Sequence, residues 1–388
     1  MNFQFYSPTK IFFGKGEENN AGKIISEYGY KKILLHYGKN SIKASGLYDK
    51  VVKSLKDNNI DFVELGGVEA NPKIGLVREG VKLCKAENVE MVLSVGGGSV
   101  IDSGKAIACG TKVDFDPWQF SIGAEKPEEA LPVGVIPTIS AAGSEMSPSC
   151  VISNPETKVK NGFTSDLVRP RFAIENPELT YSVSKFQTAC GVVDIMMHTL
   201  ERYLSDETDL DLTAEFCEGL LRNVLKYGKT AVDDPTNYKA RSELMISAGF
   251  SHNNMMEMGS KHYFTVHKLE HQLSGLYDEV AHGAGLSVLF FGWAKYVYKS
   301  FPEKFASLAR NVMGVDEPDD LKAAEAGLDR LKEYFVSLGM PVTLKELRVG
   351  EINIEEIADR ITKSDTAKVI GFVPLDKKAV FEIYKSVE

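Results

Sequence analysis

The segment EMVLSVGGGSVIDSGKAIACG (residues 90–110) joins a largely apolar run to a run with helical periodicity through three consecutive glycines. The apolar run is short and ends at the glycines, which predicts a buried strand followed directly by a helix. Glycines let the backbone approach a ligand closely, and a helix N-terminus offers N–H groups and the positive end of its dipole to an anion. The segment therefore predicts one unit of a parallel α/β sheet with a phosphate site at its turn.

A plain structural explanation of the same glycine turn stays open. Ser99 and Asp102 fit the S-x-x-D pattern of a capped helix, and the glycines alone would serve a tight turn. The segment matches neither the G-x-G-x-x-G fingerprint nor a P-loop, because its spacing differs and Ala106 follows Lys105. The mismatch with the P-loop argues against a kinase or an ATPase.

Short β-rich runs alternate with amphipathic segments on both sides of this unit. Helical patterns at 46–59 and 76–88 separate strand-like runs that end in glycine, proline or asparagine, at 31–38, 61–67, 90–98, 130–138 and 171–177. The alternation predicts a Rossmann-like parallel sheet with helices on both faces in residues 1–183. The opening FQFYSPTKIFFG (3–14) predicts either a hairpin or an added edge strand.

Residues 184–388 have a different pattern. Long stretches repeat apolar residues every 3.6 positions, at 186–205, 212–228 and 321–339, and strand-like runs almost vanish. We therefore expect a helical domain in residues 184–388, joined to an α/β domain in residues 1–183.

Composition excludes several classes of function. The 388 residues carry a formal net charge of −9, which gives no electrostatic reason to bind nucleic acid or an anionic membrane. No apolar run approaches the length of a bilayer span. The five cysteines are scattered and lack C-x-x-C spacing, so neither a disulfide framework nor a thiolate zinc site is expected. These features predict a cytoplasmic protein.

Acidic and imidazole side chains recur at helical spacing in the second half. Asp194 and His198 stand at i and i+4, His267 and His271 repeat that spacing, and His282 follows in a glycine-rich stretch. Each histidine alone is more simply a hydrogen-bonded core residue. A carboxylate inside the apolar run GVVDIMMH is costly unless it pairs with a lysine or arginine or binds a cation, and the combined pattern favours a metal. Oxygen and nitrogen donors without thiolate suit Fe²⁺ or Zn²⁺.

The turn after the strand at 31–38 indicates which nicotinamide coenzyme to expect. A carboxylate that would bind the ribose 2′-hydroxyl of NAD is often found here, but the first acid is Asp49, and the turn holds Gly38, Lys39, Asn40, Ser41 and Lys43. Such residues would accept a 2′-phosphate, so we expect NADP(H), although a solvated basic loop explains them as well. The segment at 136–153 is rich in small and hydroxylated residues, which fits either a ligand-lining loop or simple turns.

Taken in order, four motifs resemble those of the iron-containing (group III) alcohol dehydrogenases. They are GGGSVID, PTISAAGSE, the D-x-x-x-H helix, and H-x-x-x-H followed by HG. The stretch YGKNSIKASGLYD is similar to the branch of NADPH-dependent butanol dehydrogenases and aldehyde reductases. Lys39 and Asn40 stand where that branch often has glycines.

The resemblance implies a dehydroquinate-synthase-like pair of domains, one divalent metal and a homodimer. It implies that Asp194, His198, His267 and His282 hold the metal, and that His271 lies near the nicotinamide or substrate without being a ligand. We expect His271 to relay a proton. The cofactor residues that we carry over or infer are Gly38, Ser41, Gly96, Gly97, Gly98, Ser99, Val100, Asp102, Thr138, Ser147, Lys160, Leu179 and Ser182.

The expected function is hydride transfer between NADP(H) and a primary alcohol or aldehyde such as butanol or butanal. An NAD-dependent dehydrogenase of glycerol or propanediol is the nearest alternative, and the acid-free turn at 38–43 speaks against it. A dehydroquinate-synthase-like lyase would need a dense set of lysines and arginines for its anionic substrate. A catalytically inactive binding protein would not require the intact set of candidate metal ligands.

Overall fold

The computed structural model describes residues 2–205, 210–371 and 373–388. Contacts between residues divide the chain into two units. The sheet unit comprises Tyr6–Val183 and Pro235–Asn253, and the helical unit comprises Met1–Phe5, Ser184–Asp234 and Asn254–Glu388. The sequence predicts one division after residue 183, whereas contacts also group residues 235–253 with the sheet. The physical reason is close packing of Ala248 and Gly249 against the loop that holds Gly143 and Met146.

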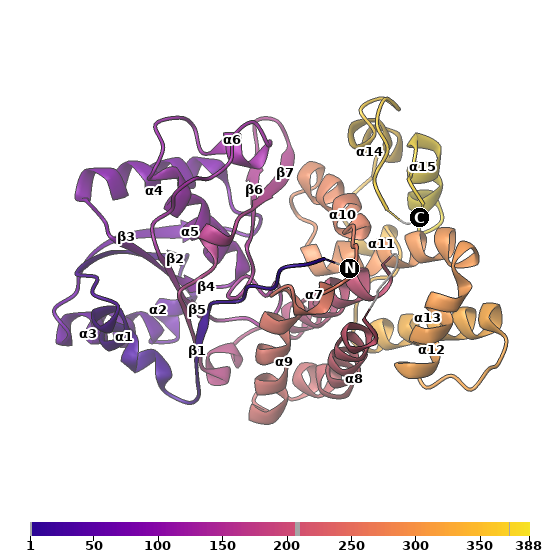
Figure 1. Cartoon of the computed structure of the whole chain (residues 1–388), viewed down its shortest axis with the longest axis horizontal. Coiled ribbons are helices and arrows are strands. Elements are labelled where there is room, and N and C mark those ends of the chain that lie inside the picture. The colour runs from indigo at the N-terminus through magenta and orange to yellow at the C-terminus, as the bar shows by residue number, and fades with distance from the viewer. Residues whose placement is uncertain (1, 206–209, 372) are drawn as a thin grey trace. The chain divides into compact units, whose positions relative to one another are not determined.

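Six parallel strands form the sheet, in the order β1-β8-β5-β4-β2-β3 (Figure 1). Their bounds are β1 (Lys10–Phe13), β2 (Lys32–Gly38), β3 (Asp61–Val68), β4 (Met91–Gly96), β5 (Val133–Pro137) and β8 (Phe172–Glu175). The parallel sheet predicted from the alternating pattern is confirmed. The opening segment forms the edge strand β1, which pairs in parallel with β8, so the hairpin alternative is wrong.

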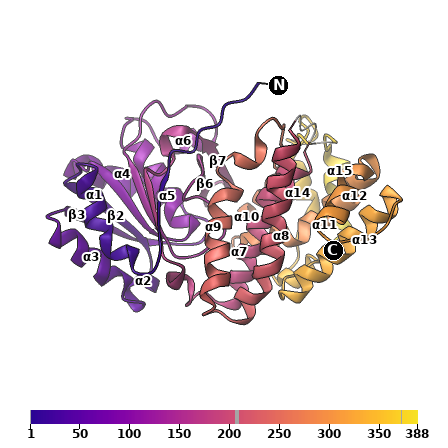
Figure 2. The same cartoon turned by 60° about the horizontal axis from the view of Figure 1, so that its bottom comes forward.

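Helices cover both faces of this sheet (Figure 2). Successive strand residues point to opposite sides, and both sides carry apolar side chains that pack against helices. On β2, Ile33 and Leu35 pack against α1 (Ala21–Glu27) and α3 (Leu47–Asp57). Leu34, between them, packs on the other face against α4 (Ile74–Glu87) and α5 (Gly98–Gly110). Strands buried on both faces explain the nearly continuous apolar runs.

The remaining elements of the sheet unit surround its layers. An antiparallel hairpin of β6 (Ser149–Asn154) and β7 (Val159–Thr164) was not predicted, because its lysine and asparagines interrupt the apolar pattern. The other α-helices are α2 (Ser41–Ala44), α6 (Trp118–Ser121) and α9 (Tyr238–Ser251), and the 3-10 helices are η1 (Glu17–Asn20), η2 (Asp166–Val168) and η3 (Pro177–Thr180).

The helical unit is built around α7 (Lys185–Tyr203), which is buried without interruption from Thr188 to Tyr203. Its buried stretch includes the polar side chains of Asp194, His198 and Glu201. Around it are α8 (Asp211–Asp233), α10 (Thr265–Leu276), α11 (His282–Val297), α12 (Pro302–Asn311), α13 (Asp320–Ser337), α14 (Ile354–Ile361) and α15 (Lys377–Lys385), with short 3-10 helices η4 (Met255–Glu257), η5 (Tyr298–Ser300) and η6 (Lys345–Leu347). Among the described residues no helix combines the length and apolarity needed to cross a bilayer.

A glycine lets α11 approach α7 closely. A Cβ atom on Gly283 would lie 2.3 Å from the backbone oxygen of Cys190 and 2.7 Å from its Cα. Gly283 follows His282, the first residue of α11, so this contact sets how near that histidine comes to α7.

Replacing Gly283 by alanine forces α11 away from α7. Overpacking of this kind destabilises a core by about 1–3 kcal/mol, so the urea midpoint of unfolding should fall. Gly219→Ala in α8 is the matched control, because a Cβ there meets nothing within 4 Å and alanine favours the helix. Equal midpoints for the two variants would contradict the close approach.

Candidate functional site

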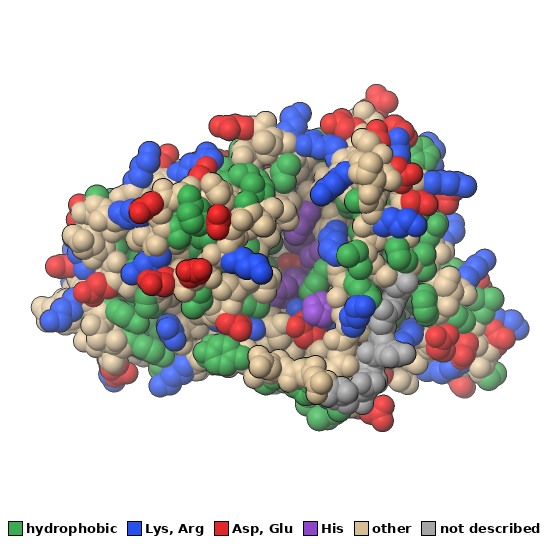
Figure 3. Space-filling model, turned by 45° about the horizontal axis from the view of Figure 1, so that its top comes forward, with side chains coloured by type: hydrophobic (Ala, Val, Ile, Leu, Met, Phe, Trp, Pro, Cys, Tyr) green, Lys and Arg blue, Asp and Glu red, His purple; other side chains and the backbone are tan. Residues whose placement is uncertain are grey.

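Three helices of the helical unit bring the predicted metal ligands together. Asp194 and His198 lie one turn apart on α7, His267 lies near the start of α10, and His282 opens α11. Asp194, His198 and His267 are buried, with 4%, 5% and 6% of their surface exposed. Histidine side chains gather on the face drawn in Figure 3.

Three imidazole nitrogens surround one oxygen of Asp194. Its Oδ1 lies 3.4 Å from His198 Nδ1, 3.7 Å from His267 Nε2 and 3.8 Å from His282 Nε2. The two longer distances exceed a hydrogen bond. They are close to the ~3.4 Å that separates two ligand atoms held tetrahedrally at about 2.1 Å from one metal ion.

Two buried glutamates hold the far side of two of these imidazoles. His267 Nδ1 donates to Glu201 Oε2, and His282 Nδ1 donates to Glu270 Oε2. With the proton on Nδ1, the lone pair is on Nε2, the atom that faces Asp194 in both residues. This carboxylate–histidine arrangement recurs behind metal-ligating histidines.

The electrostatics of the cluster favour a positive charge at its centre. Burial, followed by the neighbouring His267 and Arg202, holds the pKa of His198 well below its usual range, so this imidazole is neutral. Burial also lowers the pKa of His267, but the carboxylates of Glu201 and Asp194 outweigh it and raise that pKa to about 9. The acids thus attract either a proton or a metal cation.

The donor set fits a divalent metal. His267 Nε2 is buried and has no hydrogen-bond partner among the described residues, which is costly unless a cation uses its lone pair. Candidate ligand atoms of Asp194, His267 and His282 all lie within 4.8 Å of one another, and His198 adjoins them through Asp194. One carboxylate and three imidazoles suit Fe²⁺ or Zn²⁺. The assignment of these four ligands stays a prediction.

His271 lies beside this group. Its ring centroid is 5.5 Å from that of His282 and 6.4 Å from that of His267. Together with Glu270 and His282 it forms a second set of close donor atoms. Its place agrees with a residue that exchanges protons near the metal, a role that also stays a prediction.

An aromatic side chain that the sequence analysis missed borders the same histidines. The ring of Phe264 lies 5.1 Å from that of His267 and 6.0 Å from that of His198, centroid to centroid. Its backbone is left-handed, with φ of 49°, which is rare for a bulky residue. The Arg202 guanidinium lies 4.5 Å from the same ring and pairs with Glu257 at 2.8 Å.

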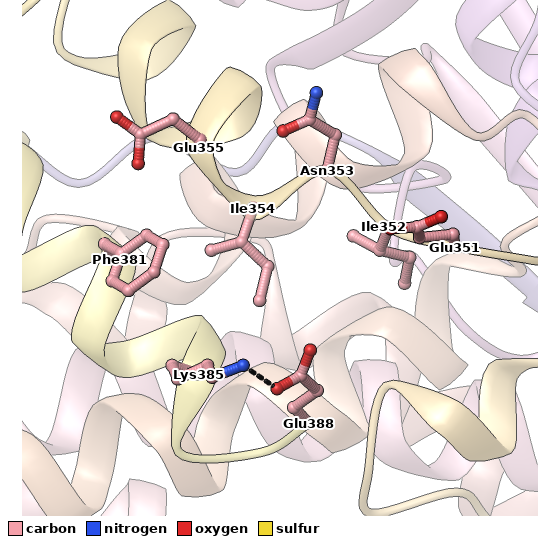
Figure 4. A pocket seen from close by; sticks show the side chains of 8 residues that line it. All are labelled: Glu351, Ile352, Asn353, Ile354, Glu355, Phe381, Lys385 and Glu388. Carbon is pink, nitrogen blue, oxygen red and sulfur yellow. Dashed lines mark hydrogen bonds and ion pairs between the residues drawn. The ribbon is translucent and has the colours of Figure 1, made fainter.

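A cavity elsewhere in the helical unit is not this site. It has a volume of about 530 Å³ and lies around α14 and α15 (Figure 4). Its lining contains no predicted site residue and consists of Glu351, Ile352, Asn353, Ile354, Glu355, Phe381, Lys385 and Glu388.

In the sheet unit, several predicted cofactor residues meet at the carboxyl ends of the strands. β2 ends at Gly38 and β4 at Gly96. A Cβ atom on Gly38 would lie 3.8 Å from Val100 Cγ2, and one on Gly96 would lie 2.5 Å from the same atom. The Thr138 N–H donates to the Gly96 oxygen at 3.0 Å. The chain changes direction across the sheet between β2 and β4, which is where open parallel sheets bind ligands.

The glycine turn leads directly into α5. Gly97, which has no side chain, is the N-cap, and Ser99 lies inside the helix, so the capping alternative is wrong. A Cβ on Gly97 would lie 2.8 Å from Ile139, and one on Gly98 would lie 3.0 Å from Ala142. The glycines therefore allow a close approach of α5 to the loop at 138–143. The phosphate site at this turn stays a prediction.

Other predicted cofactor residues have varied surroundings. The carboxylate of Asp102 accepts hydrogen bonds from Ser144 Oγ at 2.6 Å and Val151 N at 3.0 Å. The Ser147 hydroxyl oxygen accepts a hydrogen bond from Lys105 Nζ at 3.3 Å. Asp102 and Ser147 thus have a structural role, whatever their contact with a coenzyme. Lys160 is buried on β7, Leu179 lies in η3 against the core, and Ser41 and Ser182 are exposed.

The turn after β2 is paired with a carboxylate that follows β3, which the sequence did not indicate. Lys39 Nζ pairs with Glu69 Oε1 at 2.6 Å, across the ends of β2 and β3. Lys43 Nζ lies over the rings of Tyr37 and Tyr48, at 5.2 and 4.9 Å from their centroids. The turn is therefore of mixed charge, because strand pairing brings in an acid thirty positions away in the sequence.

Comparison with known proteins identifies a single family. Residues 8–177 match the family model of iron-containing alcohol dehydrogenases, and residues 188–387 match that of the C-terminal region of the same family. An NADH-dependent butanol dehydrogenase A of Clostridium acetobutylicum is 39% identical, over 99% of both chains.

Two further relatives agree. The NADPH-dependent aldehyde reductase YqhD of Escherichia coli is 32% identical over 93% of this chain and 92% of its own. The crystal structure of an NADH-dependent butanol dehydrogenase A from Thermotoga maritima superposes with a TM-score of 0.95 at 38% identity, covering 100% of this chain and 98% of that one.

Removing the central carboxylate tests the metal site. Asp194→Ala should lower metal affinity by more than the ~100-fold that loss of an outer partner costs at most, because it deletes a ligand. Metal content by elemental analysis after dialysis measures the loss. His271→Gln is the control, because His271 lies beside the predicted ligands without being one of them, and this variant should keep its metal. Full metal retention by both variants would refute the site.

Proposed function

The chain belongs to the iron-containing alcohol dehydrogenase family, and from this premise we propose that it reduces small uncharged aldehydes such as butanal with NADPH. Membership makes it an oxidoreductase of alcohols and aldehydes that uses a nicotinamide coenzyme and a divalent metal. The single observation that supports the proposed site is the set of three imidazole nitrogens 3.4–3.8 Å from Asp194 Oδ1.

In the proposed mechanism, this chain's residues hold and orient the reacting groups. When bound, the metal supplies Lewis-acid polarisation of the carbonyl, and the coenzyme supplies the hydride. Asp194, His198, His267 and His282 would hold the ion, and the glycine turn before α5 would hold the pyrophosphate. His271, beside His282, would deliver a proton to the product oxygen.

The surroundings of the histidines support an uncharged substrate. The aromatic ring of Phe264 lies beside His267. Arg202, whose guanidinium lies over the same ring, is already paired with Glu257. An anionic substrate would need cations that are free to bind it. The relatives named for butanol and aldehydes agree with this substrate class.

For the coenzyme, we propose that Lys39 reads the 2′-phosphate. Its ammonium stands at the end of β2 and is held by Glu69 in an exposed ion pair, which costs little to rearrange. Without Lys39, the Glu69 carboxylate would favour NAD, because a carboxylate at this place can accept a hydrogen bond from the ribose 2′-hydroxyl. Similar proteins are named for either coenzyme, so this residue pair is where the preference should be tested.

We also propose a cytoplasmic homodimer. All five cysteines are free and buried, which suits a reducing compartment. Phe3, Phe5 and Tyr6 expose 47%, 46% and 50% of their surfaces, and such an apolar group suits a contact between subunits.

The activity test follows coenzyme oxidation with butanal after metal removal. Chelation should abolish turnover, and Fe²⁺ or Zn²⁺ should restore it, because the metal is the group proposed to polarise the carbonyl. Undiminished activity in metal-free protein would refute the proposal, and a glycerol or propanediol preference with NAD would favour the polyol alternative.

Lys39→Ala tests the coenzyme assignment. Loss of a charge-assisted hydrogen bond of about 1.5 kcal/mol should lower kcat/KM for NADPH by about tenfold and leave NADH unchanged. Glu69→Gln should shift the preference toward NADPH. Lys31→Ala, at the opposite end of β2, is the control. An NADH kcat/KM equal to or above that of NADPH in the unmodified enzyme would overturn the assignment.

A further inference from the structure

Helix α10, which supplies His267, begins without a cap of its own. The residue before it, Phe264, has a left-handed backbone and caps no N–H group with its side chain. Helix N-termini are normally capped by serine, threonine, asparagine or aspartate at this position. Here the cap comes from another helix, because the Val266 N–H donates to Glu201 Oε1 at 2.6 Å and the His267 N–H donates to Glu201 Oε2 at 3.2 Å.

The same carboxylate also holds the imidazole of His267. Its Oε2 accepts from His267 Nδ1 as well as from the backbone of that residue. Glu201 therefore receives three donors, all from two consecutive residues of α10. Since Glu201 lies on α7 with Asp194 and His198, one side chain links the start of α10, the ring of His267 and the helix that carries the other ligands.

Glu270 lies inside α10, one turn beyond its start, and makes a comparable contact with His282. It is fully buried, and its Oε2 accepts from His282 Nδ1. Gly285 of α11 leaves room for it, because a Cβ there would lie 2.8 Å from Glu270 Cγ. Its action on the site thus passes through the ring of His282.

A cap alone does not explain a carboxylate at position 201. A serine at the N-cap position of α10 would cap that helix without placing a charge in the interior. A buried carboxylate, by contrast, is costly unless it is well paired. The cost is offset where the carboxylate orients an imidazole that binds a cation, as is common behind metal-bound histidines.

We propose that Glu201 and Glu270 are positioning residues that turn Nε2 of His267 and His282 toward the metal, and that Glu201 also couples metal binding to the docking of α10. This inference rests on the proposed metal site. It makes the two glutamates unequal: loss of either weakens metal binding, and loss of Glu201 also loosens the start of α10 in the absence of metal.

The test compares Glu201→Gln, Glu270→Gln and the control Glu218→Gln in the full-length protein. Glutamine keeps the shape but removes the negative charge and leaves a single oxygen acceptor. At position 201, where both oxygens accept, an N–H group must then face one of the α10 donors, and at position 270 the hydrogen bond to the Nδ1 proton loses its charge. Glu218 is a buried glutamate of the same unit that accepts from Tyr203 Oη and Asn311 Nδ2, both at 2.7 Å, away from the histidines.

Zinc affinity is measured by competition with a chelator, and the ligand field from the visible spectrum of cobalt-loaded protein. Both site variants should bind zinc 10- to 100-fold more weakly than the unmodified protein and show altered cobalt spectra, and the control should do neither. The melting temperature of the metal-free protein should fall further for Glu201→Gln than for Glu270→Gln.

Each outcome has a distinct meaning. Site variants that bind zinc within threefold of the unmodified protein, with unchanged cobalt spectra, overturn the inference. If Glu201→Gln does not fold, Glu270→Gln alone decides, because it leaves the start of α10 intact. Failure of the unmodified protein to bind zinc, cobalt or iron would instead refute the proposed function.

Discussion

The burial of one carboxylate, that of Asp194, constrains the whole helical unit. Its helix is covered on every side, and an ionised oxygen in such a place destabilises the fold unless positive or polarised groups surround it. Three imidazole nitrogens meet this requirement, and they come from α7, α10 and α11. The close approach at Gly283 and the cap that Glu201 gives to α10 follow from the same need, since each brings a histidine to Asp194.

In the sheet unit, the predicted phosphate site is formed mainly by backbone atoms and not by buried charged side chains. Parallel strands end on one edge of the sheet, and Gly38, Gly96 and Thr138 meet there because β2, β4 and β5 are neighbours. The uncapped start of α5 adds oriented N–H groups at the same edge. The proposed dinucleotide site would therefore need few charged side chains, which agrees with the acidic composition of the chain.

Local patterns predicted those parts of the structure that depend on short spacings. Alternating apolar runs indicated the parallel sheet, and the i, i+4 spacing indicated that Asp194 and His198 share a helix face. Contacts between distant segments could not be predicted in this way. The Lys39–Glu69 pair depends on the register of β2 with β3, and the place of His282 depends on how α11 packs against α7. Glu201 stands seven residues after Asp194 on the same face, a signal present in DIMMHTLE but common among helices that bind nothing.

Anomalous diffraction from crystals of the metal-loaded protein, recorded at the absorption edge of iron or zinc, would locate the ion itself. We expect one strong peak among Asp194 Oδ1, a ring nitrogen of His198, and the Nε2 atoms of His267 and His282, with Glu201 and Glu270 behind two of the rings. A peak at other residues, or no peak in protein that elemental analysis shows to contain metal, would contradict it.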